Sequence, residues 1–236
     1  RCRNLDTRPI ATTDLSMASI STADLSGLLS PPRLRRLFQS LAMLDAIMSP
    51  EWDYRYYSYD AKWGEGETMG SMRNGSGDEF FALFDANGCY IKGFGHEHWL
   101  SDGASTEFYK SVPDAFASGV SEPAFDPDHV TFCCWCYENA DKWEYARVER
   151  YIGREPPFDG DPDGSGYLLE DLNGDHKEYL AIVEDYYEQQ APLSSISAIY
   201  HHRPLTQELI SSLNPEVVLA DVQADADSIG YPSSQA

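Results

Sequence analysis

Apolar residues recur at helical spacing near the start of the chain. Between residues 31 and 49 they fall three or four positions apart, behind the tandem prolines Pro31 and Pro32 and ahead of Pro50. Proline suits the first turn of a helix and cannot continue one. The pattern predicts an amphipathic helix over residues 31–49. Its three arginines leave a membrane contact as the alternative, but we expect the apolar stripe to pack on the domain.

A different pattern follows over residues 51–151. Short runs that alternate or are rich in aromatic residues are typical of half-buried strands. Such runs occupy residues 52–63, 66–74, 78–84, 89–94, 129–139 and 142–151. The dipeptide Asn87-Gly88 favours a tight hairpin turn, so an antiparallel sheet is expected. Residues 104–116 have helical spacing interrupted by Pro113 and predict a short, broken helix.

Helical spacing returns after residue 163. The expected helices cover residues 166–172, 176–190, 193–202, 206–213 and 215–230, the last starting at Asn214-Pro215. Strands first and helices last indicate the α+β class, with an antiparallel sheet from the N-terminal half and C-terminal helices packed on it. We expect one domain over residues 31–236, helix-rich from 164 to 230. Residues 1–30 are rich in Ser, Thr, Ala and Asp and are interpreted as a flexible leader.

Charge narrows the classes of partner. The formal net charge is −22, and residues 51–236 carry 35 acidic against 11 basic side chains. Such a surface repels DNA, RNA and anionic lipid and attracts cations or a basic protein. The alternative interpretation is that the acidic surface only keeps the protein soluble. No apolar stretch reaches membrane-spanning length and no signal peptide is recognisable. The five cysteines are odd in number, which favours a reducing cytoplasm over a secreted disulfide framework.

The segment FDGDPDGSGYLLE has the acidic skeleton of a calcium-binding loop. Asp159, Asp161 and Asp163 alternate, and Glu170 falls twelfth in the loop. Calcium binding through these four carboxylates is one hypothesis. The favoured alternative is an acidic turn leading into a helix, capped by Ser165 or Asp163, because Pro156-Pro157 cannot end a preceding helix and glycine occupies the eighth position.

Two further segments invite a ligand. RNGSGDE, residues 73–79, resembles a phosphate loop, but it lacks the Lys-Ser/Thr ending, so a hairpin turn in which Asp78 bonds its own loop is favoured. His96 and His98 would share a face of a strand and could hold a metal with a third ligand from Glu97, Asp102, His201 or His202. The alternative is that both histidines are surface or turn residues.

Three cysteines cluster in CCWC, but their spacing does not match that of zinc ligands. Alternation in a strand places Cys133 and Cys134 on opposite faces and Cys134 and Cys136 on the same face. We expect them to pack in the core. A nucleophilic role would need a histidine and an acid nearby, such as His96, His129 or Glu138.

Aromatic and basic residues around the first strand form the candidate protein-binding site. Aromatic residues exposed among carboxylates are typical of interface hot spots, and arginines in so acidic a chain are expected to pair with carboxylates. The residues are Trp52, Tyr54, Arg55, Tyr56, Arg73 and Asp78.

Several ordered blocks resemble a family of uncharacterised bacterial proteins. The blocks include EWDYRYYSYDAKWGEGETMGSMRNGSGDEFFALF, IKGFGHE, DPDGSGYLLEDL and IYHHRPLT, and the likeness covers residues 51 to about 232, leaving 1–42 outside. The resemblance implies a cytosolic bacterial protein without an assigned reaction. Such small acidic proteins are similar in general character to the immunity partners of bacterial toxins.

Three functions follow from these patterns. The favoured one is a non-enzymatic acidic module that binds a basic protein, of the kind that neutralises a toxin. The alternatives are an enzyme that uses carboxylates or a metal, and a calcium-binding scaffold. No cofactor is expected unless the acidic loop binds Ca²⁺.

Overall fold

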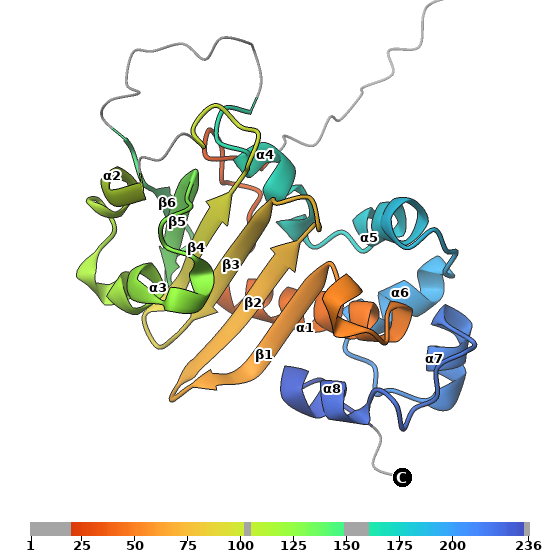
Figure 1. Ribbon diagram of the computed structural model, residues 1–236. Helices are drawn as coiled ribbons and strands as arrows, with labels where there is room; N and C mark the ends of the chain where they lie inside the picture. The colour runs from red at the N-terminus through yellow and green to blue at the C-terminus, as the bar shows by residue number, and fades with distance from the viewer. Residues whose placement is uncertain (1–19, 102–104, 149–160, 234–236) are drawn as a thin grey trace, which may run out of the picture.

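A six-stranded antiparallel sheet lies in the N-terminal half of the computed structural model, which describes residues 20–101, 105–148 and 161–233 (Figure 1). Helices follow the sheet, which confirms the α+β class. The strands lie side by side in chain order. They are β1 (Tyr57–Gly64), β2 (Glu67–Arg73), β3 (Glu79–Phe84), β4 (Gly88–Phe94), β5 (Phe132–Tyr137) and β6 (Glu144–Tyr145).

The β3–β4 hairpin turns where the sequence predicts it. The Asp85 amide donates to the Gly88 carbonyl at 3.0 Å, and the Asp85 carboxylate accepts from the Asn87 amide at 2.7 Å. Gly88 has a φ of 144°, and a Cβ there would collide with the Cys136 carbonyl of the neighbouring strand. Only glycine meets both conditions.

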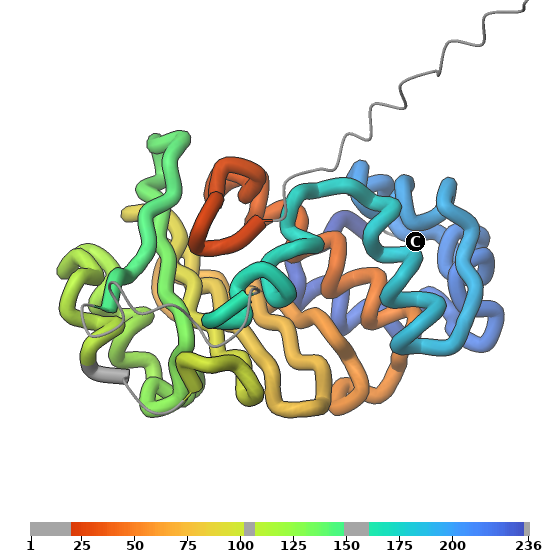
Figure 2. The backbone as a smooth tube through the Cα atoms, turned by 90° about the horizontal axis from the view of Figure 1, so that it is seen from above, coloured from red at the N-terminus to blue at the C-terminus, as the bar shows by residue number. Residues whose placement is uncertain are grey.

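Helix α1 (Pro31–Met48) lies inside the molecule rather than on it. It contacts β1 and β2 on one side and the helices α6 (Leu193–Tyr200), α7 (Gln207–Leu213) and α8 (Gln223–Ile229) on the other (Figures 1 and 2). From Leu41 to Met48 every residue is buried, so the apolar surface is wider than the predicted stripe. The close approach to β2 depends on Gly70, because a Cβ there would lie 2.6 Å from the Phe38 ring.

The C-terminal helices enclose the other side of α1. They are α4 (Ser165–Leu168), α5 (Glu178–Ala181), α6 (Leu193–Tyr200), α7 (Gln207–Leu213) and α8 (Gln223–Ile229). A π-helical turn, η6 (Ile182–Tyr186), extends α5, and a 3₁₀ turn, η5 (Glu170–Asn173), follows α4. The helix predicted from Pro215 is wrong over its first half. Asn214 instead donates to the Ile47 carbonyl at 2.9 Å and accepts from the Glu216 amide, which holds this segment as a turn against α1.

Short helices cover the opposite face of the sheet. The broken helix expected over residues 104–116 is confirmed as α2 (Ser105–Tyr109) and a 3₁₀ turn at Asp114–Phe116. Together with α3 (Ala117–Ser121) they pack over β4 and β5 (Figure 1). Cys133 faces this layer, whereas Cys134 and Cys136 face α1, as alternation predicts. Burial raises the pKa of the Cys133 thiol to about 12, which favours the neutral, packed form.

Three expected boundaries are corrected. The leader expected to be flexible over 1–30 packs on the domain from Ile20 onward, where Ile20, Leu25 and Leu28 are buried. The first strand begins at Tyr57, because Trp52–Tyr54 form a 3₁₀ turn. The last strand is only Glu144–Tyr145. Among the described residues, no helix is both long enough and apolar enough to cross a membrane.

A buried carboxylate joins three of these elements. Asp45 of α1 is fully buried and accepts hydrogen bonds from the Tyr57 amide, the Tyr179 hydroxyl and the Tyr187 hydroxyl. Burial raises the pKa of Asp45 to about 7, although these donors and the nearby Arg55 charge oppose the rise. The Tyr187 hydroxyl also accepts from the Tyr56 amide at 3.2 Å.

The raised pKa of Asp45 predicts a pH dependence of stability. The unfolded state ionises this carboxyl near pH 4 and the folded state only near pH 7, so the unfolded state is stabilised relative to the folded state as the pH rises from 4 to 7. Between pH 4 and 7 the free energy of unfolding of the wild-type protein, measured with urea, should fall on the order of 4 kcal/mol more than that of Asp45→Asn. This figure follows from about 1.4 kcal/mol per unit of pKa difference. Parallel profiles for the two proteins would contradict this account.

Gly70→Ala should destabilise the domain by about 1–3 kcal/mol, because the added methyl overpacks the contact between β2 and Phe38. The measurement is urea unfolding at neutral pH. Phe38→Leu removes the colliding ring, so the Gly70→Ala effect should shrink in the Phe38→Leu background. Additive effects of the two substitutions would show that the ring contact is not the cause.

Candidate functional site

Two adjoining pockets open at the end of the sheet where β1 begins. The larger, which we call the tyrosine pocket, has a volume of about 300 Å³. Its lining comprises Tyr56, Asn74, Ser76, Tyr167, Glu170, Asp171, Ala181, Ile182, Asp185 and Tyr186. The smaller, which we call the Arg73 pocket, has a volume of about 140 Å³ and shares Tyr56 and Tyr186 with it. The rest of its lining is Trp52, Asp53, Arg55, Ser58, Ser71, Arg73 and Gly75.

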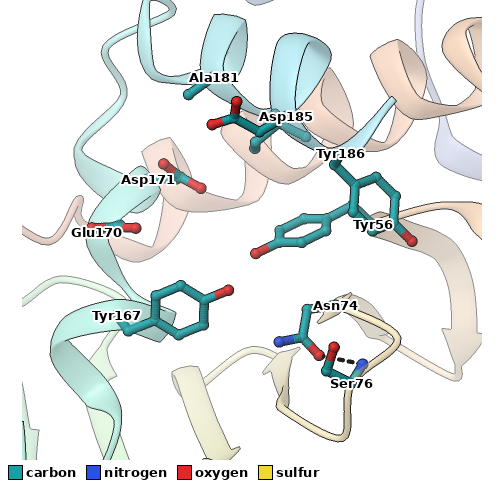
Figure 3. A pocket seen from close by; sticks show the side chains of 10 residues that line it. Tyr56, Asn74, Ser76, Tyr167, Glu170, Asp171, Ala181, Asp185 and Tyr186 are labelled. Carbon is teal, nitrogen blue, oxygen red and sulfur yellow. Dashed lines mark hydrogen bonds between the residues drawn. The ribbon is translucent and has the colours of Figure 1, made fainter. Parts of the chain in front are cut away.

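Four segments far apart in the chain form the tyrosine pocket. Tyr167 comes from α4, Asp185 from the π-helical turn, and Tyr56 from the residues before β1 (Figure 3). The hydroxyls of Tyr56 and Tyr167 point toward each other across the cavity (Figure 3). The Tyr186 ring packs edge-on against that of Tyr56, with centroids 5.0 Å apart. The pocket therefore joins the sheet to the C-terminal helices.

The loop after β2 closes the pocket from below (Figure 3). The Asn74 side-chain oxygen accepts from the Ser76 amide at 2.8 Å, and its nitrogen donates to Asp78 at 2.7 Å. Asp78 also accepts from the His96 amide and ring. Burial alone would raise the pKa of Asp78, but the hydrogen bonds from His96 and Asn74 outweigh it and lower that pKa. This self-bonded hairpin confirms the turn interpretation of residues 73–79.

Negative charge dominates the tyrosine pocket. Glu170, Asp171 and Asp185 line it, and none of its lining residues is basic. Burial, then the neighbouring carboxylates of Asp171 and Glu178, raise the pKa of Glu170. Burial also raises the pKa of Asp171, although a hydrogen bond from the Tyr57 hydroxyl at 2.9 Å opposes the rise. A cation in this pocket would relieve the repulsion between the carboxylates.

The two arginines of the smaller pocket have different surroundings. Arg55 donates to both carboxylate oxygens of Asp225, at 2.7 and 3.0 Å, and to the carbonyls of Ser49 and Pro50. The expected pairing of an arginine with a carboxylate is therefore present at Arg55. Arg73 instead lies over the rings of Trp52 and Phe81, 5.2 and 5.6 Å from their centroids.

The structure brings together most of the residues predicted to bind a protein. Trp52, Arg55, Tyr56 and Arg73 line the Arg73 pocket. Tyr54 lines neither pocket and is 63% exposed. The expectation that the aromatic residues alternate along one strand is wrong, because Trp52 and Tyr54 precede β1 in a 3₁₀ turn. Asp78 supports the loop from within rather than lining a pocket.

Of the carboxylates of the calcium-loop hypothesis, Asp161 and Asp163 line one pocket and Glu170 lines another. Asp159 lies outside the described residues. Asp161 accepts from the Tyr167 amide at 2.9 Å, and Asp163 accepts from Thr22 and Ser165. Glu170 lines the tyrosine pocket. The bond between Asp163 and the Ser165 amide matches the expected acidic turn before a helix, but the expected cap is wrong, because the N-cap position of α4 is Gly164.

The histidines of the metal hypothesis are not on a strand, since β4 ends at Phe94. His96 bonds Asp78, whereas the His98 ring lies 2.8 Å from the Asp161 carbonyl. Within residues 20–101, 105–148 and 161–233, no group of three His, Cys, Asp or Glu side chains could hold a metal ion.

Of the residues that line the tyrosine pocket, the sequence predicts only Tyr56 and Glu170 as candidate site residues. Tyr167, Asp171, Asp185 and Tyr186 were assigned only to helices. The available signal was that YLLED and EDYY each place a tyrosine within four residues of a carboxylate. Nothing in that spacing shows that the two segments meet.

Comparisons of the chain with protein-family models, curated proteins and solved structures gave no match in any of the three.

The contrast between the two arginines predicts different effects on stability. Arg55→Ala should lower the free energy of unfolding by about 3 kcal/mol, because it leaves Asp225 and two backbone carbonyls without their donor. Arg73→Ala removes only ring contacts and should cost about 1 kcal/mol or less. Urea unfolding of both variants measures the difference, and equal losses would contradict it.

Proposed function

We propose that this protein is a non-enzymatic module of the immunity-protein type that binds a basic protein partner. The partner places a lysine or arginine side chain in the tyrosine pocket. The observation that supports this most is the lining of that pocket, where Glu170, Asp171 and Asp185 face one cavity with three tyrosines and no basic side chain.

Tyrosines suit a cationic guest for two reasons. Their rings attract a cation through the negative faces of the π system, and their hydroxyls bond to its N–H groups. Tyr56 and Tyr167 supply both, and Tyr186 adds a ring to the lining. A side chain as long as that of lysine or arginine can place its alkyl stem against the rings and its charged end among the carboxylates.

The rest of the surface supports the same kind of partner. A net charge of −22 accelerates the approach of a basic protein. Trp52, Tyr54 and Tyr167 are 52%, 63% and 43% exposed, and such aromatic side chains are typical anchors of an interface. Cys89, Cys133, Cys134 and Cys136 are free thiols, which fits the proposed cytoplasmic location.

A second function has one observation in its favour. Glu170 and Asp171 share a pocket and both have raised pKa values, which is also typical of carboxylates that transfer protons in enzymes. We rank this below binding because the lining of the pocket contains no basic side chain that would neutralise negative charge in a transition state.

Binding of a hexa-arginine peptide tests the proposal, with hexaglutamate as the negative probe. By isothermal titration calorimetry, Glu170→Gln combined with Asp185→Asn should weaken the affinity for hexa-arginine about tenfold, the effect of a typical interface anchor. Glu208→Gln combined with Glu216→Gln removes the same charge from an exposed surface elsewhere and serves as the control. An equal loss of affinity for hexa-arginine in the two double variants would show that binding depends on net charge alone. It would contradict binding in the tyrosine pocket.

A further inference from the structure

The Arg73 pocket adds a positive charge beside the negative tyrosine pocket. The two cavities share Tyr56 and Tyr186, so a ligand bound in one lies next to the other. At about 140 Å³ the Arg73 pocket is too small for a large side chain but accommodates a compact polar group. Its basic lining residues are Arg55 and Arg73.

Of these two arginines, only Arg73 is available to a ligand. The NH groups of Arg55 are occupied by Asp225 and by backbone carbonyls. In the described part of the chain, the Arg73 guanidinium has no hydrogen bond or ion pair, and its side chain is half-buried. The rings of Trp52 and Phe81 hold it in place while leaving its five N–H donors unused.

Neighbouring carboxylates do not neutralise Arg73. Burial raises the pKa of Glu79, and the charge of Lys92, whose nitrogen lies 3.8 Å from the Glu79 carboxylate, opposes the rise more than the charge of Arg73 does. Asp53 lines the pocket from an exposed position, where water screens its charge.

The pocket also supplies a hydroxyl donor. The Ser58 and Ser71 oxygens lie 2.7 Å apart, so one hydroxyl donates to the other. The accepting hydroxyl keeps its own hydrogen for a third group. Two serines and a stacked guanidinium together offer donors to an oxyanion and little to a cation.

We propose that the Arg73 pocket binds a carboxylate, and that the two pockets together recognise a C-terminal lysine or arginine residue of the partner. The cationic side chain enters the tyrosine pocket and the terminal carboxylate meets Arg73. A C-terminal basic residue carries both charges, with the cation at the end of a long side chain. This inference rests on the proposed function for the first charge and extends it by the second.

A carboxylate fits better than a phosphate for an electrostatic reason. Glu170, Asp171 and Asp185 lie in the adjoining pocket, and a dianion there would be repelled about twice as strongly as a monoanion. A planar carboxylate also matches the guanidinium fork with two parallel hydrogen bonds.

Three acetylated peptides test the inference: Gly-Gly-Lys with a free carboxylate, the same peptide amidated, and Gly-Gly-Gln with a free carboxylate. By isothermal titration calorimetry, the wild-type protein should bind the free Gly-Gly-Lys about tenfold more tightly than its amide, as charge-assisted hydrogen bonds allow. Arg73→Gln should remove this preference and leave the affinity for the amide unchanged. Arg73→Lys should remove most of the preference for the free carboxylate, because lysine lacks the planar guanidinium that binds both carboxylate oxygens.

Arg33→Gln is the matched control, because it removes the same charge from an exposed position on α1. It should keep the tenfold preference. Equal affinity of the wild-type protein for the free and amidated peptides would overturn the carboxylate site while leaving the cation site intact. If the wild-type protein bound Gly-Gly-Gln tightly and did not bind the amidated Gly-Gly-Lys, the proposed function would be overturned and only the carboxylate site would be supported. Absence of binding to all three peptides would overturn both.

Discussion

The burial of Asp45 is the constraint on which the arrangement of this protein depends. A carboxylate inside a domain needs donors on every side, and here they come from the start of β1, from α5 and from the residue after the π-helical turn. These are the segments that carry Tyr56, Asp185 and Tyr186 into the tyrosine pocket. The polar group that orients the core therefore also determines where the pocket forms.

Hydrogen bonds of tyrosine hydroxyls connect the buried core to the pocket. The Tyr187 hydroxyl donates to Asp45 and accepts a hydrogen bond from the Tyr56 amide. The Tyr57 hydroxyl donates to Asp171 at the pocket wall. Each of these groups is held by its neighbours, so the pocket is shaped before any ligand arrives. A preorganised site loses less conformational entropy on binding.

The sequence allowed prediction of the sheet and of α1, because alternation and helical spacing report directly on which side chains are buried. The turn at Asn87-Gly88 and the opposite faces of Cys133 and Cys134 were predictable for the same reason. The short 3₁₀ turn at Trp52 was not, since its aromatic spacing imitates a strand. Nor was the meeting of Tyr56 with Tyr167 and Tyr186, because these residues lie on segments far apart in the chain.

The outer edge of β1 has a consequence for behaviour at high concentration. A terminal strand of a sheet exposes unpaired backbone groups to which another chain can add. Here α8 contacts β1, and the pairing of β1 with β2 is interrupted between Asp60 and Gly64. The cover by α8 and the irregular pairing of β1 both disfavour edge-to-edge association of copies. The two hydrogen bonds from Arg55 to Asp225 hold α8 in place, so they also oppose aggregation.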